Sequence, residues 1–261
     1  MKGIIRAIIN ITLLLCMLGC AKSNTESDYK YIKTKGKLAI GITMFAPMNY
    51  HNTDGELVGF DTEFAQAVCK KLGLTPEFIE INWDLKETEL VSKNIDCIWN
   101  GMTITEQLQK KLTISDPYMG NRQVLVSLKD KAAALADSID GTYIAAEQGS
   151  AGEQIAMFLQ KDVTYTPFDS QMKALNEVAA GTADAAIVDY VLSFGAFGES
   201  TALDNLVIVD RTIGDSELYG IAFRKDSDMV EKINKIISDM RADGSLNAIA
   251  VKYRLDKLLA Y

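Results

Sequence analysis

The chain has 261 residues, a length that suits two lobes of ordinary size. Its formal net charge at pH 7 is −8, which argues against nucleic acid or an anionic membrane surface as a partner. The only histidine is His51, and the sequence has no His/Cys spacing typical of a metal site. We therefore expect no metal and no cofactor.

The N-terminal segment, residues 1–19, has the pattern of an export signal. Lys2 and Arg6 give a positive start, and the apolar run that follows is too short to span a bilayer comfortably. Gly-Cys at its end resembles a lipobox, although the residues before it match that motif imperfectly. Cys20 would then be lipidated, and residues 20–36 would form the lipidated N-terminus and a tether. A soluble secreted protein cut nearby is the alternative.

Short apolar strand patterns alternate with helical patterns along the rest of the chain. This alternation is typical of an α/β fold with largely parallel sheets. The expected strands are 38–42, 78–81, 95–99, 143–146 and 185–188. The expected helices begin at residues 61, 86, 152, 171 and 190, and two more span 229–242 and 246–253.

Residues 59–72 form one predicted strand-to-helix unit. Gly59 closes the strand, Asp61 is placed to cap the helix, and Glu63 adds a negative charge near the positive end of the helix dipole. An apolar stripe for packing against a sheet recurs every four residues, at Phe60, Phe64, Val68 and Leu72.

Two cysteines beyond the N-terminal segment, Cys69 and Cys97, occupy apolar positions of a predicted helix and a predicted strand. In an exported protein they could form a disulfide. Two buried free thiols are the reading we favour, because Cys behaves as a small apolar residue in such positions.

The order of residue types in 59–72 resembles the signature of extracellular solute-binding proteins of family 3, the polar-amino-acid receptors of ABC importers. Further short matches follow in the family's order at residues 101–105, 115–118, 148–150, 181–189 and 242–246. The resemblance implies an α/β, two-lobed, periplasmic-binding-protein-like fold (type II), with two hinge crossings and a ligand cleft between the lobes. Lobe 1 would comprise 37–122 and 212–261, and lobe 2 would comprise 123–211.

The function that this resemblance implies is a monomeric substrate-binding receptor of an ABC importer. It would bind an amino acid or a close relative and deliver it to a membrane permease, while anchored by lipid to the outer face of the cell membrane or lying in the periplasm. The main alternative is an enzyme on the same fold, a periplasmic dehydratase of the prephenate or arogenate type. Glu87 or Glu147 could supply its acid or base, but neither lies in a recognisable catalytic motif. We therefore expect no enzyme.

The resemblance also implies partners for both charges of an amino acid. Asp189, at the end of the strand 185–188, would bind the ammonium group. Its alternative role is a helix N-cap. Backbone N–H groups of Gly149, Ser150 and Ala151, at the start of a helix, would bind the carboxylate.

Across the predicted cleft, Gly101 and Thr103 match family positions that contact the ligand. Phe45 and Trp83 match positions where aromatic rings stack on the ligand side chain. Thr43 stands where receptors of basic amino acids often have Asp, which argues against Lys or Arg as the ligand.

One position departs from the family pattern. Relatives usually carry Arg five residues after Thr103, where it binds the ligand carboxylate bidentately, but this chain has Leu108. Deleting a buried charge partner costs about 3–5 kcal/mol, so either another group compensates or the ligand differs. Arg122 is the nearest candidate by location, and a structural hinge arginine is the alternative reading of that residue.

Overall fold

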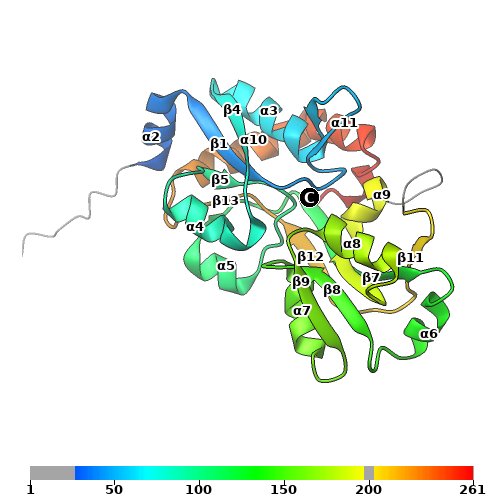
Figure 1. Ribbon diagram of the computed structural model, residues 1–261. Coiled ribbons are helices and arrows are strands. Elements are labelled where there is room, and N and C mark those ends of the chain that lie inside the picture. The colour runs from blue at the N-terminus through cyan, green and yellow to red at the C-terminus, as the bar shows by residue number, and fades with distance from the viewer. Residues whose placement is uncertain (1–26, 197–202, 261) are drawn as a thin grey trace, which may run out of the picture.

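The computed structural model describes residues 27–196 and 203–260. They form two lobes, each built around its own sheet, as Figure 1 shows. The predicted signal segment and the lipidation site Cys20 lie outside the described residues. Within the described ranges, no helix has both the length and the apolar character needed to cross a membrane.

The first lobe contains a five-stranded sheet in which β1 pairs in parallel with β4 and β5, while β13 runs antiparallel to β5 and β6. Its strand order is β4 (Thr75–Glu80), β1 (Lys37–Ile42), β5 (Cys97–Ile98), β13 (Ala222–Phe223) and β6 (Thr113–Ile114). A short hairpin pairs β2 (Tyr50–His51) with β3 (Leu57–Val58). The helical elements of this part are α2 (Asp28–Lys35), α3 (Phe60–Leu72), η1 (Trp83–Leu85), α4 (Lys86–Val91), α5 (Glu106–Lys111), α10 (Met229–Ala242), α11 (Ser245–Lys252) and η3 (Asp256–Leu258).

The second lobe contains a mixed sheet in which β8 pairs in parallel with β9 and β10, and β7 is antiparallel to its neighbours. Its order is β11 (Leu206–Ile208), β7 (Met119–Leu128), β10 (Ala185–Asp189), β8 (Tyr143–Glu147) and β9 (Thr164–Phe168), and β12 (Ser216–Tyr219) also pairs with β7. The helical elements are α6 (Ala132–Asp137), α7 (Ala151–Leu159), α8 (Gln171–Ala180), η2 (Tyr190–Leu192) and α9 (Ser193–Ala196).

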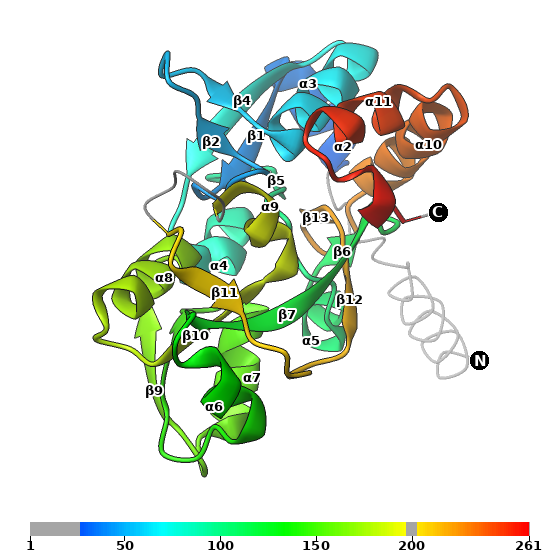
Figure 2. The same ribbon diagram turned by 90° about the vertical axis from the view of Figure 1, so that its right-hand side faces the viewer.

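The chain passes between the lobes along two antiparallel strands, β7 and β12 (Figure 2). Ser216 lies opposite Arg122 and Tyr219 lies opposite Met119 in this pair. The two-lobed α/β fold predicted from the sequence is confirmed. The predicted lobe boundaries fall within β7 and shortly before β12, and they remain a prediction.

Helix α3 forms where its periodicity predicts, but Asp61 does not cap it. The N-cap is Gly59, with no side-chain cap hydrogen bond. The Asp61 carboxylate is buried and accepts hydrogen bonds from the Gly101 N–H (2.7 Å) and the Tyr118 hydroxyl (2.9 Å). This burial raises the pKa of Asp61 to about 7. The capping prediction is wrong, because a carboxylate at the helix start satisfies a distant loop instead.

Gly59 itself is required by its backbone, which has φ of 129°. A Cβ atom here would also collide with the carbonyl group of Met48. We expect Gly59→Ala to lower the free energy of unfolding by about 2–3 kcal/mol, measured by urea denaturation. The matched control is Gly55→Ala, where φ is 79° but no atom lies within 4 Å of the added Cβ. Equal losses for the two variants would contradict the steric part of this explanation.

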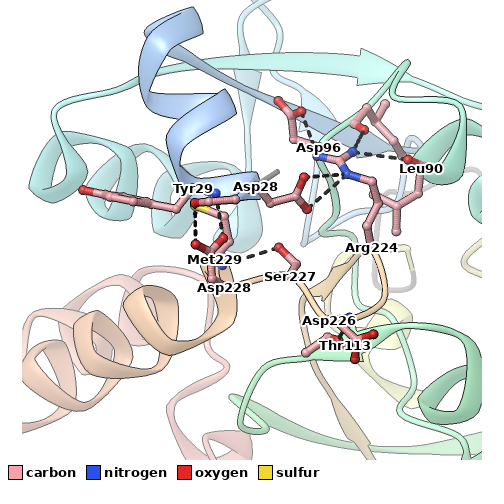
Figure 3. Close-up of polar contacts among 12 residues, drawn as sticks. Asp28, Tyr29, Leu90, Asp96, Thr113, Arg224, Asp226, Ser227, Asp228 and Met229 are labelled. Carbon is pink, nitrogen blue, oxygen red and sulfur yellow. Dashed lines mark hydrogen bonds and ion pairs between the residues drawn. The ribbon is translucent and has the colours of Figure 1, made fainter. Parts of the chain in front are cut away.

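A cluster of buried charges attaches α2 to the first lobe (Figure 3). The Arg224 guanidinium contacts Asp28 through Nε (2.9 Å), Asp96 through Nη2 (3.4 Å), and the carbonyl oxygens of Leu90 and Ile95 through Nη1. We expected residues 20–36 to form a tether. That expectation is wrong for residues 28–35, which fold as a helix held by this cluster.

Cys69 and Cys97 are both buried and unpaired, so the thiol reading is confirmed and the disulfide alternative is not. Burial raises the pKa of the Cys69 thiol to about 12 and the pKa of the Cys97 thiol well above its usual range. Burial therefore disfavours the thiolate, the reactive form of cysteine, at both positions.

Candidate ligand-binding site

A pocket between the lobes gathers most of the predicted site residues. About 450 Å³ of space, which includes open solvent, lies between its walls. The predicted residues that line it are Phe45, Trp83, Gly101, Thr103, Gly149, Ser150, Ala151 and Asp189.

Asp189, the last residue of β10, brings a buried carboxylate to this pocket. The carboxylate accepts hydrogen bonds from the side-chain amides of Gln123 (2.8 Å), Asn121 and Gln171. Asp189 is also the N-cap residue of η2, but its side chain makes no capping hydrogen bond there. The pKa of Asp189 is raised to about 6, mainly by burial and secondly by the negative charge of the nearby Glu217.

Glu217, on the connecting strand β12, joins the same polar network, although sequence reasoning did not select it. The Thr103 hydroxyl donates to Glu217 Oε2 (3.1 Å). The amides of Asn121 (3.0 Å) and Gln123 (2.9 Å) donate to the same oxygen. Thr103 is therefore tied to the strands that join the two lobes.

The loop that follows β5 places Gly101 against the aromatic wall of the pocket. Gly101 has φ of 56°, and a Cβ atom there would lie 2.7 Å from Phe45 Cε1. Its N–H already donates to Asp61. Phe45 and Trp83 are both buried and line the pocket, as the stacking prediction requires.

The turn at the start of α7 uses two of its three predicted donors internally. The Gly149 N–H donates to Glu153 Oε2 (2.6 Å), and the Ser150 N–H donates to the Glu147 carbonyl (3.2 Å). Ser150 is the N-cap, and its hydroxyl accepts from the Glu153 N–H. Among the described residues, the Ala151 N–H has no acceptor. The expected anion site is therefore reduced to one backbone donor in this arrangement.

Residues 38–256 match the sequence profile of the bacterial extracellular solute-binding proteins, family 3. The chain belongs to this family. The prediction made from residues 59–72 and the later motifs is confirmed.

Individual relatives of this solute-binding protein cover nearly the whole chain. The arginine-binding extracellular protein ArtP of Bacillus subtilis (strain 168) is 30% identical over 246 residues, covering 93% of each chain. An ABC uptake transporter substrate-binding protein from Streptococcus pneumoniae, solved with bound histidine, has a TM-score of 0.83 and 29% identity, covering 91% of this chain and 100% of that one. The ancestral amino acid-binding protein AncCDT-1, a precursor of cyclohexadienyl dehydratase, has a TM-score of 0.78 and 28% identity, covering 87% of this chain and 99% of that one.

The structure of this solute-binding protein does not bring Arg122 to the pocket. Leu108 does line the pocket. The Arg122 side chain is exposed, and its guanidinium carbon lies 3.8 Å from the centre of the Tyr190 ring. The prediction that Arg122 replaces the missing arginine is corrected, and its structural reading describes it better.

Two charged residues of the pocket were not predicted as ligand contacts. Lys86, the first residue of α4, is 6% exposed, and burial lowers the pKa of its ammonium group. Glu147, the last residue of β8, is 5% exposed. Burial, with the nearby Asp189, raises the pKa of Glu147 to about 8, against the opposing effects of Lys86 and a hydrogen bond with Gln171. Across the described residues, no group of three or more His, Cys, Asp or Glu side chains could hold a metal ion.

The buried carboxyl group of Glu147 makes the stability of the solute-binding protein depend on pH. Its pKa rises from an ordinary 4.5 to about 8 on folding, so the folded state binds more protons than the unfolded state between these values. The free energy of unfolding therefore falls as pH increases from 4.5 to 8. We expect Glu147→Gln to be more stable than the unmodified protein by about 4 kcal/mol at pH 8 and by less than about 1 kcal/mol at pH 5.

Urea denaturation at pH 5, 6.5 and 8 checks this expectation. Glu106→Gln, which removes an exposed carboxylate at the start of α5, is the matched control and should leave the pH dependence unchanged. A pH profile of Glu147→Gln that runs parallel to that of the unmodified protein would show that Glu147 does not titrate in this way.

Proposed function

We propose that the protein is the substrate-binding receptor of an ABC importer and that its ligand is an amino acid held between the lobes. The observation that carries this proposal is the state of Asp189. Its carboxylate is buried at the pocket wall, and no lysine, arginine or histidine among the described residues forms an ion pair with it. A buried carboxylate without a cation is costly, and a ligand ammonium group would supply the missing partner.

The remaining pocket residues fit the rest of an amino acid. Phe45 and Trp83 offer aromatic faces for the ligand side chain. Thr103 and Ala151 contribute polar groups from opposite lobes. Relatives that are named for arginine or were solved with histidine support an amino acid as the ligand class.

Two pocket residues give contrary indications about the side chain of the ligand. By the family resemblance, Thr43 stands where receptors of basic amino acids often have Asp, which argues against Lys or Arg. Glu147 places another carboxyl group in the same pocket and could accept a cationic side chain or a hydrogen-bond donor. Basic and neutral amino acids therefore both belong in the first ligand screen.

Binding is favoured over catalysis by the same relatives, which are named as binding proteins. The dehydratase alternative is kept because AncCDT-1 is described as a precursor of such an enzyme. Glu147, with its raised pKa, is the group that would act as an acid. Turnover of prephenate or arogenate by the purified protein would establish the enzyme.

The experiment that tests the receptor is a thermal-shift screen of the mature protein against the twenty common amino acids. A ligand at about 100 times its Kd adds about 2.7 kcal/mol to the free energy of unfolding. We expect one amino acid or one chemically related group to give such a shift. No shift with any amino acid would contradict the ligand class.

The way in which the receptor reaches the membrane is part of the proposal. Residues 1–19 would act as a signal peptide, Cys20 would carry the lipid anchor, and a permease would receive the ligand. The family's description as extracellular supports export. Cys20→Ser should move the protein from the membrane fraction to the soluble fraction, and continued membrane association would contradict lipid anchoring at this residue.

A further inference from the structure

The pocket contains a buried cation, Lys86, to which no family motif assigns a role. The Lys86 ammonium lies 4.8 Å from the centre of the Trp83 ring and donates to two backbone carbonyls, those of Gly149 (2.8 Å) and Trp83 (3.2 Å). An ammonium group has three donors, so one remains after these two bonds.

No described carboxylate forms an ion pair with this ammonium group. Four acidic residues influence Lys86 electrostatically without pairing with it, namely Glu87, Glu147, Asp84 and Glu153. Three of them have other partners. Glu87 binds Lys111, and Glu153 binds Tyr165 and the Gly149 N–H. Asp84 accepts from the Gln148 side-chain amide. The cation therefore faces the pocket without an anion of its own.

Of these four acidic residues, only Glu147 lines the same pocket as Lys86. It is not within ion-pair distance of Lys86, and its raised pKa leaves most of the carboxyl neutral at pH 7. The contact of Lys86 with Gly149 also places the ammonium beside the turn whose Ala151 N–H has no acceptor. Lys86 and Ala151 thus each bring one unused donor to the same pocket.

We propose that Lys86 holds the carboxylate of the bound amino acid, in the role that Leu108 cannot perform. This inference rests on the proposed function. Lys86 and Leu108 both come from the first lobe and line the same pocket, so a cation on α4 can serve where a cation on α5 is missing. Asp189 holds the ammonium end of the ligand from the second lobe. The Lys86 bond to the Gly149 carbonyl positions the ammonium across the space between the lobes.

The test compares one amino acid with its own α-carboxamide, in which the carboxylate is replaced by a neutral group. The amino acid is the one that gives the largest shift in the screen, and both Kd values are measured by isothermal titration calorimetry. The unmodified protein should prefer the amino acid by about 100-fold or more, because a buried carboxylate–ammonium pair is lost with the amide. In Lys86→Met this preference should fall to within about 5-fold of unity.

The ratio of the two Kd values separates binding from folding, because both ligands are measured on the same variant. If Lys86→Met does not fold, Lys86→Gln keeps a donor for the Gly149 carbonyl and removes the charge. Lys110→Met, an exposed lysine of α5, is the matched control and should keep the full preference. An unchanged ratio in the Lys86 variant would overturn the proposal and assign Lys86 a structural role. Failure of the unmodified protein to bind any amino acid would instead overturn the proposed function.

Discussion

Replacement of Asp189 by asparagine is expected to weaken amino acid binding by two to four orders of magnitude. The change keeps the shape of the side chain but removes the charge that would pair with the ligand ammonium. Leaving a buried charge without its partner costs about 3–5 kcal/mol, which gives this loss of affinity. Isothermal titration calorimetry with the amino acid identified in the screen measures it directly.

Asp184→Asn is the matched control for this experiment. Asp184 precedes the same strand and binds Lys131 (2.7 Å) and the Tyr143 N–H (3.0 Å), and it does not line the pocket. Its substitution should leave the ligand Kd unchanged. Tight binding retained by Asp189→Asn would show that the ammonium group is held elsewhere.

Replacement of Arg224 by methionine is expected to be the most destabilising of the substitutions considered. The guanidinium of Arg224 is buried between Asp28 and Asp96, and the Asp96 side chain is fully buried. Lys35 would remain as a partner of Asp96 at 2.5 Å, but Asp28 and the carbonyls of Leu90 and Ile95 would lose their donor. Breaking such a cluster from one side costs about 3–5 kcal/mol.

Urea denaturation of Arg224→Met measures this loss. The matched control is Lys37→Met, which removes a partner of Glu77 from a pair whose side chains are 44% and 41% exposed. Exposed pairs contribute about 0–1 kcal/mol, so this variant should be nearly as stable as the unmodified protein. Similar losses for both variants would mean that the buried cluster contributes no more than a surface pair.

The sequence predicts the architecture well because the fold depends on periodic apolar patterns. The last long helix was expected at residues 229–242, and α10 has these bounds. Phe60, Phe64 and Val68 of α3 are buried where the four-residue spacing places them, and Leu72 is half-buried. Asp61 was misread because its position at a helix start matches the local rule for a cap. Its actual partners, Gly101 and Tyr118, lie 40 and 57 residues away in the sequence. Rules for helix caps consider only neighbouring residues and therefore do not identify them.

Only part of the site was predicted, because local sequence patterns do not indicate which charged residues become buried. Asp189, Gly101 and the aromatic positions follow from family motifs, whereas Lys86 and Glu147 are charged residues at element ends, which are usually exposed. The burial of Lys86 involves the approach of the two lobes, since its ammonium group contacts the Gly149 carbonyl of the second lobe. Local sequence patterns do not predict such contacts between the lobes.

Arg122 was misplaced because position along the chain does not reveal the face of a strand. Side chains alternate between the two faces of β7. Asn121 and Gln123 point to Asp189, so Arg122 between them lies on the other face, over Tyr190. Applying strand alternation to the residues on either side of Arg122 would have separated it from the pocket.

The amide groups that bind Asp189 affect how a change in the apparent Kd of the ligand should be interpreted. Asn121 and Gln123 belong to β7, and both also bind Glu217 on β12, so the carboxylate that would bind the ligand is fixed to the two strands that connect the lobes. A substitution at either amide would change the ligand contact and the fraction of molecules in the binding-competent form together. The apparent Kd is the intrinsic Kd divided by that fraction. Engineering this receptor as a sensor therefore requires both quantities to be measured, since selectivity and signal amplitude share the same residues.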